Sequence, residues 1–240
     1  MTWKKKPNIY IYMETVNGLW IGTLGRLQIL SIKSWLKAGY KYNLWVYDLN
    51  MENVPVGVKL CDANIILDEK YIFKHWSGTY ATFADMFRYK LLYDVGGWWV
   101  DLDLVCLRRL PDIEIFFGAE RTKLRGAFKS KMKHRLWIGL LKFPPRDEDP
   151  LCLNAKDPIL KDMIDDMMSK IEDFQNPEKK IPFTYGQTRL DKLLKKIVGN
   201  DYLYLQDNYT PSLYNPLSYF DMIDFFSKKT FWFKIYNTKN

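Results

Sequence analysis

The pattern of apolar and polar positions along the first half of the chain predicts strands that alternate with helices. Residues 8–15, NIYIYMET, alternate and are rich in β-forming side chains, so they predict a first strand, which the loop 18–25, GLWIGTLG, follows. Residues 27–40 carry apolar side chains at helical spacing, residues 42–49 predict a second strand, and residues 52–67 predict a turn and a short strand. This alternation favours an α/β fold with a mixed, mainly parallel sheet flanked by helices.

The clearest helix lies between residues 79 and 97. Its apolar side chains recur at four-residue spacing, at Phe83, Phe87 and Leu91. We expect Thr79 to be the N-cap, because threonine accepts hydrogen bonds from the first turn, and we expect Gly96 and Gly97 to end the helix. Two short strands should follow, at residues 98–100 and 104–107.

The second half predicts further strands and helices without a linker. Strands are expected at 114–120 and 134–143, a polar loop at 144–150, and helices at 157–174, 186–197 and 215–226. No stretch rich in glycine, proline or serine divides the chain, so we predict a single domain over residues 1–240.

The composition is that of a globular protein with ample core material. Apolar residues make up 48% of the chain, aromatic residues 16%, and the formal net charge is +8. This excess of positive charge suits an anionic ligand but also describes an ordinary solvated surface. The lysines are scattered and no nucleic-acid-binding motif is present, which argues against DNA or RNA as a partner.

Cysteine usage and hydropathy indicate a cytoplasmic protein. Cys61, Cys106 and Cys152 are too few and too widely spaced for a disulfide framework or a zinc motif, so we expect reduced thiols. No apolar segment approaches the roughly 20 residues of a membrane span, so no transmembrane segment is expected. Residues 225–240 mix aromatics with lysines; they predict a closing core element, with a peripheral contact to a membrane surface as the alternative.

Two carboxylates stand in an apolar run, DVGGWWVDLDLV, at residues 94–105. On an extended strand Asp101 and Asp103 would project from the same side, separated by roughly 7 Å of backbone rise. Two neighbouring anions repel each other, and a hard divalent cation removes that cost while it keeps open positions for phosphate. Ligands of parallel sheets bind at the carboxyl ends of strands, where Asp101 is expected. The pair therefore predicts a metal–diphosphate site, the alternative being two aspartates that cap a strand at the surface.

Asp85 and Arg88 share one face of the predicted helix, because they are three residues apart. They form either a surface ion pair, which would contribute well under about 1 kcal/mol, or a pair that binds a polar ligand such as sugar hydroxyls. The apolar neighbours Phe83, Met86 and Phe87 favour the second interpretation.

Residues 79–110 resemble the sugar-binding region of the family 32 glycosyltransferases that carry a DxD motif. Relatives include capsule and lipopolysaccharide glycosyltransferases, Golgi mannosyltransferases and, more distantly, the glucosylating domains of clostridial toxins. The pattern A-x-x-S-D-x-x-R-Y, leucine, G-G-x-Y, D-x-D is met at Ala81, Ala84, Asp85, Arg88, Tyr89, Leu92, Gly96, Gly97, Trp99, Asp101 and Asp103. Ala84 replaces the usual serine and Trp99 the usual tyrosine. Residues 18–25 resemble the family's W-x-G segment, less sharply.

The resemblance implies a GT-A type nucleotide-sugar-binding fold, with residues 1–110 on the donor side and 111–240 on the acceptor side. It implies metal-dependent transfer of a sugar, with retention of configuration, from a UDP-sugar, or a GDP-sugar, to a glycan acceptor. Asp85 and Arg88 would bind the donor sugar and phosphate, Asp101 the ribose and the metal shell, and Asp103 would coordinate Mn²⁺ or Mg²⁺.

Other nucleotide-sugar contacts are expected by the same resemblance from Trp20, which would stack on the base, and from Gly22, Gly96 and Gly97. His134 or a residue in DNYTPSLYNP, 207–216, is a candidate to complete the metal or phosphate shell. The segment TYGQTRLDKLL also resembles the family, but Gly186-Gln187 stands where a Gly-Pro is frequent, which leaves the acceptor side unassigned.

Two other functions fit parts of the sequence. A glycosidase with Asp101 and Asp103 as catalysts is disfavoured, because such carboxyls face each other across a bond about 5 to 9 Å apart, whereas DxD carboxyls on one strand face the same way. A non-catalytic module that binds a nucleotide-sugar or a polyanion is favoured by the net charge of +8.

Overall fold

The computed structural model describes residues 14–110, 116–121, 146–182, 185–198, 209–213 and 232–235. Its strands are β1 (Thr15–Leu19), β2 (Lys41–Val46), β3 (Val58–Asp62), β4 (Gly97–Trp99), β5 (Leu104–Cys106), β6 (Phe116–Arg121), β7 (Arg146–Leu153), β8 (Tyr209–Leu213) and β9 (Trp232–Ile235). Its α-helices are α2 (Arg26–Lys37), α3 (Ala81–Val95), α5 (Pro158–Met168), α6 (Ile171–Gln175) and α7 (Tyr185–Val198), and its 3-10 turns are η1 (Ala63–Ile65), η2 (Glu69–Tyr71) and η4 (Pro177–Lys179).

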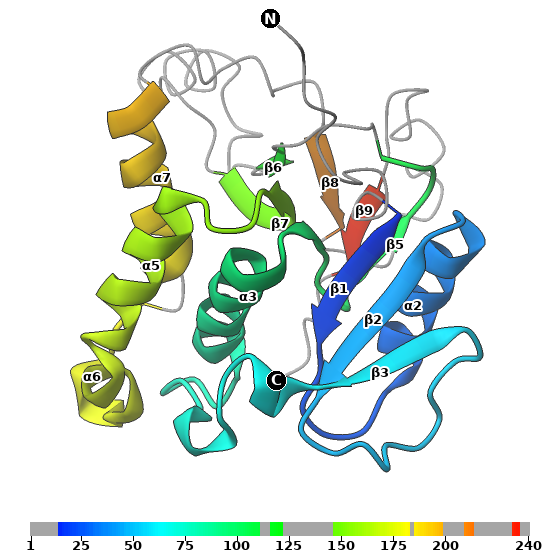
Figure 1. Cartoon of the computed structure of the whole chain (residues 1–240), viewed down its shortest axis with the longest axis horizontal. Coiled ribbons are helices and arrows are strands. Elements are labelled where there is room, and N and C mark those ends of the chain that lie inside the picture. Colours follow the sequence, from blue (N-terminus) through cyan, green and yellow to red (C-terminus); the bar gives the residue numbers. More distant parts are fainter. Residues whose placement is uncertain are drawn as a thin grey trace, which may run out of the picture.

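The described strands form one nine-stranded sheet in the order β3-β2-β1-β4-β7-β6-β8-β9-β5. Strands β3, β2, β1 and β4 run parallel, and β7 joins β4 in the antiparallel sense. The predicted α/β fold with a mixed, mainly parallel sheet flanked by helices is therefore confirmed (Figure 1). Strands from both predicted halves, 1–110 and 111–240, share this sheet, and their donor-side and acceptor-side roles stay predictions.

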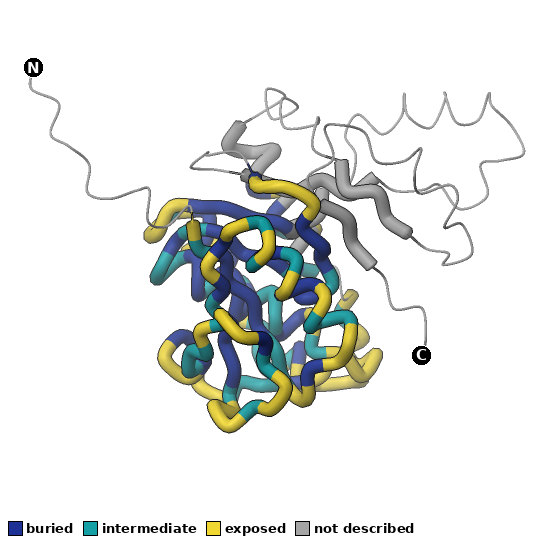
Figure 2. The backbone as a smooth tube through the Cα atoms, turned by 90° about the vertical axis from the view of Figure 1, so that its right-hand side faces the viewer, coloured by how far each residue is buried: buried dark blue, intermediate teal, exposed yellow. Residues whose placement is uncertain are grey.

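Two hydrophobic clusters cover the two faces of the sheet. Trp98 points to the face that α2 covers, where Ile32 and Trp35 are fully buried. Its neighbour Trp99 points to the opposite face, where α3 and α5 pack and Phe87 is fully buried. Successive strand residues alternate between faces, so two adjacent tryptophans fill both cores. Figure 2 shows the buried stretches running through the middle of the described fold, with exposed stretches at its periphery.

The order of the strands reverses at β1. The chain leaves β1 for β2 and then β3 on one side, and it returns through α3 to β4 on the other side of β1. In open parallel sheets the helices before and after such a reversal leave a crevice at the carboxyl ends of the strands. The topology therefore predicts a ligand site where β1 and β4 end.

The first described strand differs from the prediction. We expected a strand at residues 8–15 and a loop from Gly18; residues 8–13 lie outside the described part, and β1 runs through Gly18 to Leu19. Asparagine and glycine are poor strand formers, but both are explained by contacts. Asn17 donates to the backbone carbonyl of Trp98 across β4, and a Cβ at Gly18 would lie 2.6 Å from Tyr42 Oη and 2.9 Å from Val100 O.

Three other expectations need correction. Helix α3 begins at Ala81 with Tyr80 as its N-cap, so Thr79 is not the cap. The polar segment 144–150 was expected as a loop, yet β7 begins at Arg146, because pairing with β6 outweighs its poor strand composition. The helix expected at 157–174 is divided into α5 and α6.

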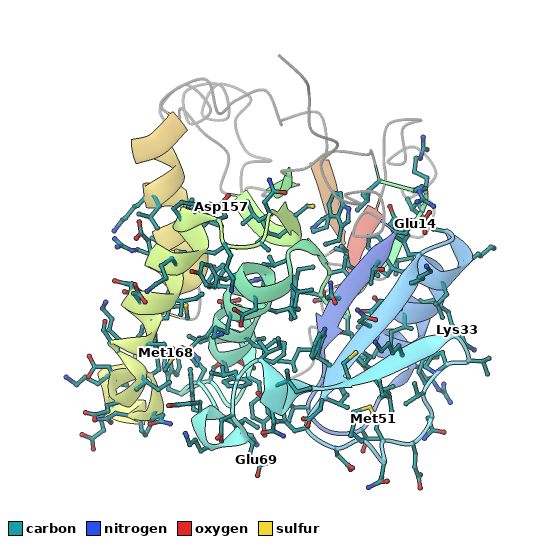
Figure 3. The ribbon with its side chains drawn as sticks, in the orientation of Figure 1. Glu14, Lys33, Met51, Glu69, Asp157 and Met168 are labelled. Carbon is teal, nitrogen blue, oxygen red and sulfur yellow. The ribbon has the colours of Figure 1, made fainter. Side chains whose placement is uncertain are left out.

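Helix α5 shows the boundary signals that the sequence carries. The side chain of Asp157 accepts a hydrogen bond from the Ile159 backbone at 3.0 Å, and Pro158 follows as the first helical residue. Asp157 and Met168 mark the two ends of this helix in Figure 3. The strand expected at 134–143 and the helix expected at 215–226 lie outside the described residues. Within the part that is described, no helix has the length and apolarity needed to cross a membrane.

Candidate functional site

A pocket of ≈ 610 Å³ lies at the carboxyl ends of β1 and β4, where the strand order reverses. The segment after β1, the segment after β4, the start of α2 and the start of α3 each supply part of its wall. The lining residues are Leu19, Trp20, Ile21, Leu27, Gln28, Thr79, Tyr80, Ala81, Ala84, Asp85, Trp99, Asp101, Leu102 and Asp103. The structure therefore brings Trp20, Asp85, Asp101 and Asp103, all predicted site residues, into one pocket.

Arg88 links the carboxylates behind this pocket. It is only 4% exposed. One guanidinium nitrogen pairs with Asp85 Oδ1, and the other lies 3.6 Å from Asp101 Oδ1. The indole of Trp99 donates to the same Asp101 oxygen at 2.8 Å and lies below the guanidinium, with 5.8 Å between Arg88 Cζ and the ring centroid. Arg88 and Asp85 are thus no solvent-exposed ion pair, because the arginine is buried and joins two segments of the chain.

The Asp101-Leu102-Asp103 segment is a turn and not the extended strand that the spacing predicted. Strand β4 ends at Trp99, and the Leu104 backbone N–H donates to Asp101 O at 3.2 Å. A hydrogen bond connects the end of this turn to α2: the Ser31 hydroxyl donates to Leu104 O at 2.6 Å. Both carboxylates nevertheless line the same pocket, so the turn brings them together where a strand was expected to do so.

The pocket is rich in negative charge. Asp85, Asp101 and Asp103 line it with three carboxylates, and the single guanidinium of Arg88 contacts two of them. A diphosphate brought to this wall would meet anions, and unit charges 4 Å apart repel by about 4 kcal/mol at the effective dielectric of a protein surface. A cation between the carboxylates and the phosphates would convert this repulsion into attraction.

The donor set fits a small divalent cation. Mg²⁺ and similar ions are bound by one or two carboxylates together with substrate phosphates and water, and seldom by a cage of protein ligands. Asp101 and Asp103 supply two carboxylates in one turn, and among the residues that the structure describes no group of three or more His, Cys, Asp and Glu forms such a cage. The other shell candidates are His134 and the segment 207–216. His134 lies outside the described residues, and no side chain of 207–216 is described.

Trp20 is the first residue after β1, as expected. Its backbone N–H continues the pairing with β2 by donating to Trp45 O at 3.0 Å, and its indole Nε1 donates to Thr23 O at 3.0 Å. The ring lines the pocket and also packs against the core beside α2. Gly22 lies in the same loop with a φ of +97°, a conformation that favours glycine, but it is not among the lining residues.

Gly96 and Gly97 lie away from the pocket. Gly96 ends α3 with a φ of +72°, and a Cβ there would lie 2.7 Å from the backbone nitrogen of Ala155. Gly96 precedes β4 and Gly97 is its first residue, so both lie at the amino end of the strand whose carboxyl end leads to Asp101. The structure explains Gly96 by the helix stop and by close packing against the segment after β7.

Some residues of the site were not predicted. Gln28 and Tyr80 line the pocket, and their only sequence signal is a position at the start of a helix that follows a strand end or a loop. Asn17 links β1 to its two neighbouring strands. Its side chain accepts hydrogen bonds from Asn43 and from the Trp45 indole in β2, both at 3.1 Å, and donates one to the Trp98 carbonyl in β4. A polar residue in an apolar buried strand was the available signal for Asn17.

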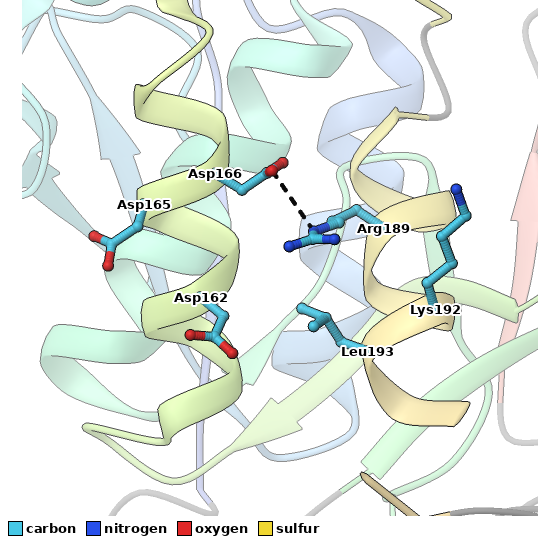
Figure 4. Close-up of a pocket in the computed structure, with 6 residues that line it drawn as sticks. All are labelled: Asp162, Asp165, Asp166, Arg189, Lys192 and Leu193. Carbon is cyan, nitrogen blue, oxygen red and sulfur yellow. Dashed lines mark ion pairs between the residues drawn. The ribbon is translucent and has the colours of Figure 1, made fainter. Parts of the chain in front are cut away.

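A second pocket of ≈ 490 Å³ lies between α5 and α7 (Figure 4). It is lined by Asp162, Asp165, Asp166, Arg189, Lys192 and Leu193. Asp166 faces Arg189 across it, with Arg189 Nε 3.8 Å from Asp166 Oδ1. Burial alone would raise the pKa of Asp166, but hydrogen bonds from Lys170 and Tyr185 and the nearby positive charges lower it overall. These contacts join the two helices.

Two glycosyltransferases are among the solved structures that are similar to this chain. The PaToxG glycosyltransferase has a TM-score of 0.48 and 16% identity, over 80% of this chain and 72% of that one. The apo-form glycosyltransferase GlyE of Streptococcus pneumoniae TIGR4 has a TM-score of 0.40 and 17% identity, over 76% of this chain and 43% of that one. Both TM-scores lie below 0.5, so the fold is described from the chain's own strand order. No curated protein matches the chain.

A family model matches the part of the chain that builds the pocket. It is described as the glycosyltransferase sugar-binding region containing DXD motif, and it matches residues 25–117, less than half of the chain. The matched segment includes α2, α3 and the Asp101–Asp103 turn, and so most of the pocket's polar side chains. The match confirms the predicted resemblance: residues 25–117 are similar to the glycosyltransferase sugar-binding region that contains a DXD motif.

Proposed function

We propose that the chain is a metal-dependent, retaining glycosyltransferase of the GT-A type that moves a sugar from a nucleotide-sugar donor to a hydroxyl of a glycan acceptor. The observation that carries the proposal is the acidic pocket at the strand-order reversal, which Asp85, Asp101 and Asp103 line and behind which the buried Arg88 contacts Asp85 and Asp101. The family model names a sugar-binding region and a DXD motif, which implies a divalent metal in general; Mn²⁺ and a UDP-sugar are our choices.

The reaction breaks the bond between the anomeric carbon and the phosphate oxygen of the donor. The electron pair of that bond stays on the departing diphosphate, and a new bond forms from the acceptor oxygen to the anomeric carbon. The acceptor proton passes to the departing phosphate oxygen, so atoms and charge balance. The chain must therefore stabilise negative charge that grows on the diphosphate.

The pocket residues take distinct parts in this reaction. Asp103 would hold the cation directly, as the resemblance implies, and Asp101, one oxygen of which contacts Trp99 and Arg88, would contribute to the metal shell. When bound, the cation would act as a Lewis acid on the diphosphate. Arg88 would hold the Asp85 and Asp101 carboxylates in place, and Asp85 would accept hydrogen bonds from donor-sugar hydroxyls.

Trp20 would orient the nucleotide. Its ring lines the pocket directly after β1. An indole at this position can stack on a flat base without reading its edge. We therefore propose that Trp20 contributes affinity for the base and that the DXD turn selects the diphosphate.

The main alternative is a binding module without turnover. The net charge of +8 suits a polyanion, but the described wall of the pocket is acidic, and an acidic wall repels a polyanion that brings no cation. The alternative predicts donor binding without release of nucleoside diphosphate.

The experiment is a donor screen. Purified protein with Mn²⁺ is incubated with UDP-, GDP- and TDP-sugars, and thermal shift and release of nucleoside diphosphate are measured. The proposal expects release from at least one donor, loss of release in excess chelator, and a product whose anomeric configuration by NMR equals that of the donor. Binding without release from any donor supports the module, and an inverted product contradicts retention.

A further inference from the structure

The first turn of α7 lies directly against Asp85. A Cβ built on Gly186 would lie 2.9 Å from Tyr89 Oη, 3.0 Å from Asp85 Oδ2 and 3.2 Å from Asp85 Cβ. All three distances are shorter than an ordinary van der Waals contact. The backbone of α7 therefore forms a wall behind the side chain that lines the donor pocket from α3.

Local backbone conformation does not explain this glycine. Gly186 is the second residue of α7 and has no positive φ, unlike Gly22 or Gly96. Alanine suits a helical backbone better than glycine, and Gly186 is buried. The close approach to α3 is thus the feature of the structure that requires the missing side chain.

The residue before Gly186 contacts both α5 and α6. The Tyr185 hydroxyl donates to Asp166 Oδ2 at 2.6 Å, and the Tyr185 ring meets Phe174 edge to face at 5.2 Å between centroids. One turn later, Arg189 faces the same aspartate (Figure 4). Asp166 thus ties the first two turns of α7 to α5, which sets how closely Gly186 approaches Asp85.

We propose that Gly186 is a positioning residue for sugar transfer: its bare backbone lets α7 confine the Asp85 carboxylate between Arg88 and the donor pocket. The inference rests on the proposed function, because it assigns Asp85 to the donor sugar. A methyl group at this position would displace the Asp85 carboxylate. The loop after β1, which carries Trp20, and the Asp101–Asp103 turn would stay in place.

Gly186→Ala tests this proposal, with Thr188→Ala as a control, since Thr188 is exposed in the same turn of α7. Donor turnover, affinity for free nucleoside diphosphate with Mn²⁺, and melting temperature are measured for both variants. We expect Gly186→Ala to lose about tenfold in turnover, less than the roughly 100-fold that a full 1 Å misplacement costs at a reacting centre, because the Asp85 atoms must give by only a few tenths of an ångström. Its nucleoside diphosphate affinity should stay within about twofold, and the control should match the wild type.

A double variant separates positioning from general damage. If Gly186→Ala acts through Asp85, the variant that combines it with Asp85→Ala should turn over donor no more slowly than Asp85→Ala alone. Additive losses, an equal loss of nucleoside diphosphate affinity, or wild-type turnover in Gly186→Ala would each overturn the inference. Wild-type protein that turns over no donor would instead refute the proposed function, and the inference with it.

Discussion

Replacing Arg88 by lysine keeps one positive charge behind the pocket but removes the forked guanidinium. In the native structure Arg88 Nη2 pairs with the Asp85 carboxylate, and Arg88 Nη1 lies 3.6 Å from Asp101 Oδ1. The compact ammonium of lysine cannot span both carboxylates in the same geometry. The change therefore breaks the link between α3 and the DXD turn without removing the charge.

The expected loss of stability follows from these contacts. Losing one charge-assisted hydrogen bond costs about 1.5–3 kcal/mol. For a chain of this size each kcal/mol lowers Tm by about 2–4 °C, so Arg88→Lys should melt about 3–12 °C lower. Arg88→Met, which removes the charge that the two carboxylates share, should cost about 3–5 kcal/mol and melt lower still.

Turnover should fall further than stability predicts. With Asp85 and Asp101 no longer held together, Arg88→Lys should lose about 100-fold or more in donor turnover at a temperature where it is fully folded. Arg26→Lys, an exposed arginine at the start of α2, is the control and should behave as wild type. Wild-type kcat and KM in Arg88→Lys would refute the assignment and leave Arg88 with a purely structural role.

Three further changes test other parts of the site. Asp103→Asn should reduce turnover by about 100-fold or more and weaken donor binding in Mn²⁺ with little change in Tm; a variant that binds and turns over donor normally would remove Asp103 from the metal site. Trp20→Ala should raise the Kd of nucleoside diphosphate about tenfold to 100-fold, because base stacking contributes about 1–3 kcal/mol, and Trp20→Phe should lose less; a lower Tm with unchanged affinity would assign Trp20 to the core. The pKa of Asp166 is lowered in the folded state, so its contribution to stability is present above its unfolded pKa of about 3.9 and is lost as pH falls through the folded pKa. Asp166→Asn should therefore melt below wild type at pH 7 and approach it below about pH 4, and a Tm difference independent of pH would contradict this.

The pairing of site residues could be predicted where local geometry decides it. Helical spacing alone places Asp85 and Arg88 on one face, and the rule for parallel sheets places the residues after β1 and β4 at one edge. Trp20 and Asp101 meet in the pocket for that reason. These predictions needed no knowledge of distant contacts.

Features that depend on distant contacts could not be predicted. The spacing of Asp101 and Asp103 indicates a strand, because strand side chains alternate. In the sheet, however, β5 pairs with β9 at the far edge and not with β4. The chain must therefore turn between β4 and β5. The start of β7 at Arg146 is polar and is followed by a proline at 150, and its pairing with β6 makes it a strand. The helical pattern of α7 likewise indicates a helix but not which element it contacts, so the approach of Gly186 to Asp85 required the structure.

The most direct test of the central claim is the release of nucleoside diphosphate from a UDP-sugar by the wild-type chain and by Asp103→Asn, each with Mn²⁺ and then in excess chelator. We predict release by the wild type with Mn²⁺, which chelator abolishes and fresh Mn²⁺ restores, and about 100-fold slower release by the variant with Mn²⁺. Release by the wild type at an unchanged rate in chelator, or equal rates for the two proteins with Mn²⁺, would contradict the claim that the DXD turn holds a catalytic metal at the donor diphosphate.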